Sequence, residues 1–115
     1  MSGIETLPAV TPAEALATHH AGAMLLDVRE HDEWMAGRAD GATHVPMSEL
    51  PGRLAELPRD RRVVCICRSG NRSAQVTAWL FQQGFDAVNM TGGMRAWAAD
   101  ELPFANFNGN PGVVI

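Results

Sequence analysis

The sequence predicts an α/β fold in which a mostly parallel central sheet is flanked by helices. Two short, almost entirely apolar runs, residues 24–28 and 62–66, are typical of strands that are buried on both faces. Stretches with helical spacing separate such runs, and strands that alternate with helices favour parallel pairing. A chain of 115 residues, of which 46% are hydrophobic, has the size and composition of one soluble domain, and we expect it to span residues 1–115.

Capping and stop signals divide the chain into its expected elements. Thr11, Pro12 and Glu14 combine a capping box with a proline in the first helical turn, which predicts that a helix begins there. The expected helices span residues 11–20, 30–36, 49–56 (capped by Ser48), 73–83 and 93–100. In the helix over residues 73–83, helical spacing places Ala74, Ala78 and Phe81 on one face. The expected strands span residues 24–28, 43–45, 62–66 and 85–90. The turn-rich tail, residues 103–115, forms either a small hairpin or a segment that wraps the surface.

Composition excludes several classes of function. The formal net charge of -4 argues against a nucleic-acid partner, since phosphate binding needs clustered basic residues. No apolar stretch reaches the roughly 20 residues that a membrane span needs. Residues 1–8 lack the basic start and apolar run of a signal peptide, so we expect a cytoplasmic protein with no membrane partner. The two cysteines, Cys65 and Cys67, would both be reduced there.

The segment CRSGNRS, residues 67–73, contains the residues best suited to chemistry. It connects a predicted buried strand to a predicted helix, at the sheet edge where α/β proteins bind ligands. Backbone amides of such a loop can converge on an anion, and the following helix and two arginines add positive potential. Cys67 is therefore expected to have a lowered pKa and to be nucleophilic. Cys65 lies inside the apolar strand and is expected to be a packing residue.

The chain resembles the rhodanese family over nearly its whole length, and three motifs carry the resemblance. They are residues 27–30 with 33–34 and 37–42 (DVRE, EW and GRADGA), residues 67–73 (CRSGNRS), and residues 91–97 (TGGMRAW). Their order and spacing match the family's motifs. Arg38 departs from the pattern, because many members have His at that position, but it lies outside the cysteine loop.

The resemblance implies a rhodanese-like fold and a sulfurtransferase. Cys67 would accept a sulfane sulfur from a small-molecule donor such as thiosulfate and form a persulfide. The acceptor would be cyanide, a thiol or a thioredoxin-like protein, and no metal or organic cofactor is implied. The backbone amides of the loop would cradle the persulfide, Arg72 would steer an anionic donor, and Arg68 would face solvent and select donors. The expected substrate-binding residues are Arg68, Ser69, Gly70, Asn71, Arg72 and Ser73.

Asp27 lies at the carboxyl end of the predicted strand over residues 24–28, at the edge of the sheet that carries the loop 67–73. Either it supports the catalytic loop from behind by hydrogen bonding, or it forms a structural ion pair with Arg29 or another arginine. Arg29 and Glu33 have the i, i+4 spacing of a helical ion pair, so we expect them to pair. The four histidines show no metal-ligand spacing with a cysteine, and none is expected to bind metal.

Three other functions compete with sulfur transfer. A phosphatase or arsenate reductase on the same fold needs five residues between its cysteine and arginine, whereas four separate Cys67 from Arg72. A thiol–disulfide oxidoreductase usually has two residues between its cysteines, whereas one separates Cys65 from Cys67. A non-catalytic rhodanese-like binding or regulatory module would lack a working cysteine, which this loop retains.

Overall fold

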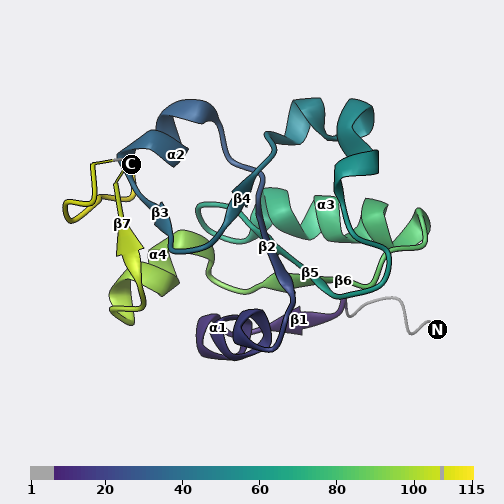
Figure 1. Ribbon diagram of the computed structural model, residues 1–115, viewed down its shortest axis with the longest axis horizontal. Coiled ribbons are helices and arrows are strands. Elements are labelled where there is room, and N and C mark those ends of the chain that lie inside the picture. The colour runs from purple at the N-terminus through teal and green to yellow at the C-terminus, as the bar shows by residue number, and fades with distance from the viewer. Residues whose placement is uncertain (1–6, 107) are drawn as a thin grey trace.

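The computed structural model describes residues 7–106 and 108–115, and it is built around a five-stranded parallel sheet (Figure 1). The strands are β1 (Ala9–Val10), β2 (Met24–Asp27), β4 (Thr43–His44), β5 (Val63–Ile66) and β6 (Ala87–Met90). They lie in the order β1-β6-β5-β2-β4, and every neighbouring pair is parallel. The mostly parallel sheet predicted from the sequence is confirmed. Because β5 is the central strand, the loop that follows it emerges from the middle of the carboxyl edge.

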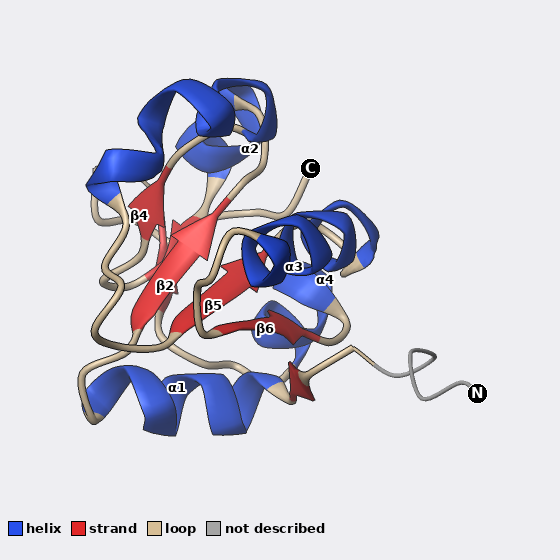
Figure 2. Ribbon diagram, turned by 90° about the vertical axis from the view of Figure 1, so that its right-hand side faces the viewer, coloured by secondary structure: helices blue, strands red, loops and turns tan. Residues whose placement is uncertain are grey.

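Helices cover both faces of the sheet, as the sequence predicts. They are α1 (Pro12–His20), α2 (His31–Ala36), the 3₁₀ segment η2 (Met47–Glu56), α3 (Asn71–Gln82) and α4 (Gly93–Ala99). Residues of α1 and α4 join the hydrophobic cluster on one face, and residues of η2 and α3 join the cluster on the other. Figure 2 shows α1 and α3 on opposite sides of the strands. The central strands are thus covered on both sides, which explains why most of their residues are apolar.

The residues of β5 alternate between the two hydrophobic clusters. Val63 and Cys65 pack under α3, whereas Val64 and Ile66 pack on the side of α1 and α4. This is the two-residue period of an extended strand. Cys67 follows the same alternation and belongs to the cluster under α3. The strand therefore points the sulfur of Cys67 toward the first turn of α3.

The first helix begins where its capping box predicts. Thr11 Oγ1 accepts a hydrogen bond from the Glu14 amide at 3.1 Å, and Glu14 Oε1 accepts one from the Thr11 amide at 2.8 Å. The helix ends at His20, and Gly22 follows with a φ of 116°. This left-handed conformation is available to glycine at little cost, which explains the stop.

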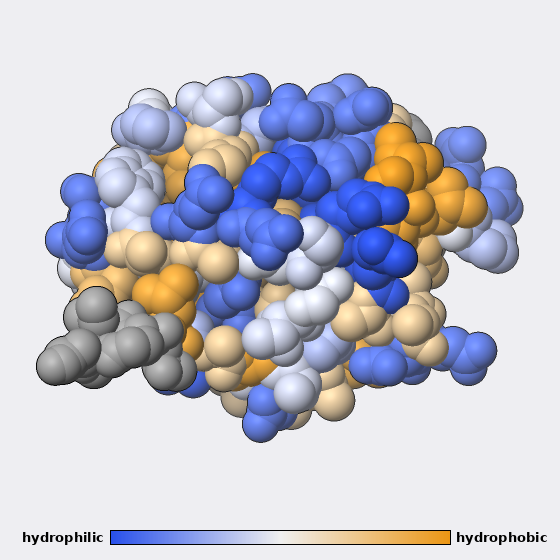
Figure 3. All heavy atoms as spheres, turned by 180° about the vertical axis from the view of Figure 1, so that it is seen from behind, coloured by the Kyte–Doolittle hydropathy of each residue, from blue (hydrophilic) through white to orange (hydrophobic). Residues whose placement is uncertain are grey.

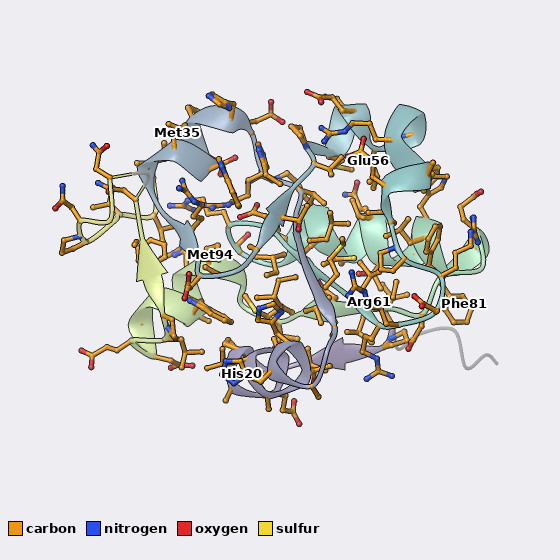
Figure 4. The ribbon with its side chains drawn as sticks, viewed as in Figure 1. His20, Met35, Glu56, Arg61, Phe81 and Met94 are labelled. Carbon is orange, nitrogen blue, oxygen red and sulfur yellow. The ribbon has the colours of Figure 1, made fainter. Side chains whose placement is uncertain are left out.

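The buried face of α3 differs from the predicted one. Its buried residues are Ser73, Val76, Thr77 and Leu80. The sequence analysis instead grouped Ala74, Ala78 and Phe81, but Phe81 is 62% exposed and lies at the outer end of α3, far from the buried Met94 (Figure 4). The helix is turned so that Ser73 faces Cys67, and the buried positions follow from it at helical spacing. The buried face of α3 therefore includes the residue that contacts the sulfur of Cys67.

Two further segments differ in detail from the prediction. The helix expected over residues 49–56 is a 3₁₀ segment that begins at Met47, because Pro46 precedes it and Pro51 lies within it. The tail wraps the surface, and its strand β7 (Phe104–Ala105) pairs antiparallel with β3 (Arg38–Ala39).

The described residues contain no helix that is both long and apolar enough to cross a membrane. Residues 1–6, on which part of the signal-peptide prediction rests, lie outside the residues that the structure describes.

Candidate active site

The loop after β5 curls around the sulfur of Cys67. Gly70 adopts a φ of 102°, a left-handed conformation that turns the chain into α3. The Gly70 amide donates a hydrogen bond to Cys67 Sγ at 3.0 Å, and Ser73 Oγ lies 3.3 Å from the same sulfur. Cys67 is 1% exposed. The loop therefore forms a tight ring of hydrogen-bond donors around one buried sulfur atom.

These donors determine the acidity of the thiol. Burial raises the pKa of Cys67, because it disfavours the charged thiolate. The Ser73 hydroxyl and the backbone amides of Ser73, Gly70 and Ser69 outweigh this effect, so the pKa lies below the ordinary value of 9.0. The lowered pKa predicted from the sequence is thus supported, and it makes Cys67 a nucleophile at lower pH than a free thiol.

The first residues of α4 hold the outer side of the loop. The Met94 amide donates to the Cys67 carbonyl at 2.8 Å, and the Arg95 amide donates to the Arg68 carbonyl at 3.0 Å. A Cβ on Gly93 would collide with both of these carbonyl oxygens, and Gly93 has a φ of 60°. The glycines of the third motif therefore allow the helix start to approach the loop backbone. With its carbonyls held outward, the loop presents its amides inward.

Asn89 on β6 supports the loop from below. Its Oδ1 accepts a hydrogen bond from Ser73 Oγ at 2.6 Å, and its Nδ2 donates to the Gly70 carbonyl at 3.2 Å. Both partners are residues whose donors face Cys67. The sequence analysis missed Asn89, although one polar residue in the apolar run AVNM was a visible signal.

Arg72 closes the loop and is held by Glu33 of α2. Its Nη1 and Nη2 donate to Glu33 Oε1 and Oε2, each at 2.8 Å. The hydrogen bonds from Arg72 lower the pKa of Glu33 to about 2 against the opposing effect of burial, so the carboxylate is charged at neutral pH. The sequence analysis expected Arg72 to steer an anionic donor. Its positive charge is instead largely balanced by the Glu33 carboxylate.

The expected pairing of Arg29 with Glu33 is wrong. Helix α2 begins at His31, so Arg29 precedes it and the i, i+4 relation does not apply. Arg29 instead pairs with Asp27, with Nη2 and Oδ2 at 2.8 Å and both side chains fully buried. Arg29 Nη2 also donates to the Gly37 carbonyl at 2.7 Å. Of the two roles left open for Asp27, the structure supports the ion pair with Arg29.

The remaining loop residues lie at the surface. Ser69 and Asn71 are exposed, and Arg68 is half-buried. Arg68 Nε donates to the Ile115 carbonyl at 2.8 Å, and the Ile115 side chain is 49% exposed. Seen from behind, the molecule carries strongly hydrophilic side chains beside a hydrophobic patch (Figure 3). Arg68 thus connects the loop to the end of the tail.

The pKa of Cys65 is shifted in the opposite direction to that of Cys67. Cys65 is fully buried in β5, and burial raises its pKa to about 12 against the small opposing effect of the Thr77 hydroxyl. Both cysteines are free thiols. Within residues 7–106 and 108–115, no group of three or more His, Cys, Asp or Glu side chains could hold a metal ion.

Comparison with known proteins shows what the sequence and the fold of this chain are similar to. Residues 11–100 match the rhodanese-like domain family. A sulfurtransferase of Allochromatium vinosum is 46% identical over 81 residues, which are 70% of this chain and 76% of that protein. A rhodanese-related protein of Thermoplasma volcanium superposes with a TM-score of 0.80 at 32% identity, covering 85% of this chain and 97% of that one. A rhodanese-like domain protein of Staphylococcus aureus has a TM-score of 0.74 at 31% identity, over 79% and 91% of the two chains.

Proposed function

The chain belongs to the rhodanese-like domain family, and from this membership we propose that it is a sulfurtransferase that carries sulfane sulfur as a persulfide on Cys67. One observation supports the proposal most directly. The sulfur of Cys67 lies inside a ring of donors that includes the Gly70 amide at 3.0 Å and the Ser73 hydroxyl at 3.3 Å. Such a ring stabilises a negatively charged sulfur, which is the form needed for attack.

The reaction divides into two displacements at sulfur. In the first, the Cys67 thiolate attacks the sulfane sulfur of thiosulfate, a sulfur–sulfur bond forms, and sulfite leaves with the electron pair of the broken bond. In the second, a nucleophile such as cyanide or a thiolate attacks the outer sulfur, and Cys67 leaves as the thiolate. The loop amides stabilise the outer sulfur of the persulfide between the two steps.

The size of the loop favours sulfur over phosphate. Four residues separate Cys67 from Arg72, one fewer than a phosphatase loop needs. A tetrahedral anion requires donors for each of its oxygens, whereas a persulfide requires them around one atom. We therefore prefer sulfur transfer to phosphate hydrolysis.

The two arginines differ in their suitability for donor recognition. Arg72 pairs with Glu33, so an anionic donor must compete with a carboxylate for this guanidinium. Arg68 lies at the surface beside the tail and remains our candidate for donor selection. The proposal includes a small-molecule donor, a thiol or cyanide acceptor, and a reducing cytoplasmic setting in which both thiols stay free.

Intact-protein mass spectrometry tests the proposal. The protein is incubated with thiosulfate, desalted and measured, and we expect an increase by the mass of one sulfur atom. Addition of cyanide should remove this increase and release thiocyanate. The Cys65→Ala variant serves as the matched control, because it removes the neighbouring thiol and should still gain one sulfur.

Two results would contradict the proposal. One is the absence of added sulfur with thiosulfate and with persulfide donors, in a protein whose Cys67 remains free to alkylate. The other is steady hydrolysis of an aryl phosphate without persulfide formation, which would make the protein a phosphatase. A third result would contradict only the assignment to Cys67: a Cys67→Ser variant that still gains one sulfur would move the carrier to another residue.

A further inference from the structure

Asn89 is the one polar residue in the four-residue strand β6, and its side chain is 8% exposed. A polar group in this position lowers stability unless it is hydrogen-bonded. Asn89 uses both ends of its amide, with Oδ1 facing Ser73 and Nδ2 facing the Gly70 carbonyl. The Gly70 carbonyl can only accept a hydrogen bond, so it fixes the orientation of the amide and leaves Oδ1 toward Ser73.

The Ser73 hydroxyl faces two acceptors but has one proton. Its oxygen lies 2.6 Å from Asn89 Oδ1 and 3.3 Å from Cys67 Sγ. When Cys67 is a neutral thiol, its S–H can donate to Ser73 Oγ while the hydroxyl donates to Asn89, and every group is satisfied. When Cys67 is a thiolate, the sulfur needs the same hydroxyl proton. Asn89 Oδ1 then has no hydrogen-bond donor, although it lies 2.6 Å from the Ser73 oxygen.

We propose that Asn89 is a positioning residue that competes with Cys67 for the hydroxyl proton of Ser73, which turns between Asn89 Oδ1 and the sulfur as the charge on the sulfur changes. The proton stays on Ser73 throughout, so only its hydrogen-bond partner changes. Asn89 therefore favours the uncharged states of Cys67 Sγ and opposes the thiolate. The hydrogen bond from Ser73 Oγ to Asn89 Oδ1 is short, whereas the one from Asn89 Nδ2 to the Gly70 carbonyl is longer. Asn89 therefore acts on the sulfur mainly through Ser73.

The inference rests on the proposed function for its place in the reaction. In the persulfide the charge lies on the outer sulfur, so Cys67 Sγ is uncharged and the Ser73 hydroxyl returns to Asn89. When an acceptor removes the outer sulfur, the Ser73 hydroxyl again donates its hydrogen bond to the departing thiolate. Asn89 thereby raises the free energy of the unloaded thiolate relative to the loaded persulfide. The two states are then closer in free energy than they would be in a loop that only stabilises the thiolate.

Few charged groups act on this sulfur. Arg72 faces Cys67 from α3, and its charge is balanced by Glu33 from α2. Cys65 from β5 stays neutral, because its pKa is about 12. The sequence contains no tyrosine, so thiolate absorbance in the far ultraviolet reports Cys67 alone up to the titration of Cys65.

The decisive variant is Asn89→Leu, which has nearly the same shape and lacks both polar groups. If Asn89 competes for the proton, its loss frees Ser73 for the thiolate, and the pKa of Cys67 falls by about half a unit to one unit. If Asn89 only supports the fold, its loss loosens the donors and the pKa rises. The sign of the shift therefore separates the two roles. Where Asn89→Leu does not fold, Asn89→Val removes the same groups in a residue that suits a strand, and it carries the same expectation.

Two further variants complete the test. In a Ser73→Ala background, Asn89→Leu should no longer shift the pKa, because the contested proton is absent. Thr77→Val is the matched control, since Thr77 Oγ1 donates to the Ser73 carbonyl at 2.8 Å and is fully buried, but offers the hydroxyl proton no alternative acceptor. It should not lower the pKa of Cys67. A rise or no change in Asn89→Leu, or an equal fall in the Ser73→Ala background, overturns the inference. These titrations need no sulfur donor, so they can fail independently of sulfur transfer.

Discussion

Cys65 lies inside β5 and Cys67 directly follows the last residue of that strand, and the two face the same side of the sheet yet differ in chemistry. Both are almost fully buried, and both belong to the hydrophobic cluster under α3. Burial raises the pKa of Cys65 to about 12, whereas the pKa of Cys67 is lowered despite burial. The difference is in the backbone around them. Cys65 pairs with β2 and β6 on either side, so the neighbouring amides are engaged in the sheet.

The position of the strand end is therefore what distinguishes the two thiols. Beyond Ile66 the amides are no longer committed to the sheet, and those of Ser69, Gly70 and Ser73 turn toward the sulfur of Cys67. Burial alone makes a cysteine inert, whereas burial with converging donors makes it reactive. The predictions below test this difference, beginning with the largest expected effect.

Replacing each thiol in turn by an unreactive group should abolish activity in one case and largely retain it in the other. We expect Cys67→Ser to reduce sulfur transfer from thiosulfate to cyanide by roughly 1,000-fold or more, because the nucleophile is lost. Cys65→Ala should retain at least about half of the activity and cost about 1–2 kcal/mol of stability through the small cavity it leaves. Activity assays and thermal melts measure both. Equal loss of activity in the two variants would make the cysteines a functional pair.

Removing the left-handed turn should disable Cys67 without removing its sulfur. We expect Gly70→Ala to lower activity by roughly 100-fold, because a φ of 102° strains alanine and its Cβ would meet the Gly92 amide at 3.3 Å. Gly22→Ala is the matched control, since Gly22 has a φ of 116° and nothing lies within 4 Å of its Cβ. The control should lose about 1 kcal/mol of stability and keep its activity. Similar activity in both variants would show that loop shape is unimportant.

Releasing Arg72 should change donor preference more than reactivity. We expect Glu33→Gln to lower KM for thiosulfate by about threefold to tenfold, because the guanidinium becomes free to pair with an anion. KM for an uncharged persulfide donor should stay within about twofold. Steady-state kinetics with both donors measure this. Loss of activity with both donors would mean that the Glu33–Arg72 pair is needed to keep the loop in shape.

The two thiols should also affect stability with opposite signs at alkaline pH. The raised pKa of Cys65 contributes stability that is present below 9.0, the pKa of an ordinary thiol, and is lost as pH rises to about 12. The lowered pKa of Cys67 contributes stability that is present above 9.0 and is lost as pH falls through the folded value. All nine residues counted as Lys or Arg are arginines and tyrosine is absent, so few other groups titrate there. Denaturant unfolding of the Cys65→Ala variant should show a smaller loss between pH 9 and 12.

Sequence patterns predicted the parts of the site that are local in the chain. The loop 67–73, the buried strand before it and the helix after it follow from short-range signals of hydrophobicity and capping. The reactive Cys67 and the inert Cys65 were also distinguished, because one lies at the strand end and the other inside it. Local spacing failed for Arg29, which was assigned to Glu33 although the helix begins only at His31.

The contacts that sequence patterns missed all join distant segments. Glu33 and Arg72 are 39 residues apart, and Asn89 and Ser73 are 16 apart, so no periodicity relates them. The predicted face of α3 was also wrong, because Val76 and Leu80 form the buried apolar face together with Ser73, whereas Phe81 lies outside it. Each of these contacts depends on how the strands are ordered in the sheet, which the sequence alone did not specify.

The close approach of Gly93 to the loop has a consequence for recognising active relatives. Any side chain at this position would press on the carbonyls of Cys67 and Arg68, from a helix that begins 26 residues after the cysteine. A relative could therefore keep an intact CRSGNRS loop and still be inactive through one substitution outside it. Surveys that sort family members into catalytic and non-catalytic groups should require the glycine pair together with the cysteine, because the shape of the loop is encoded in both places.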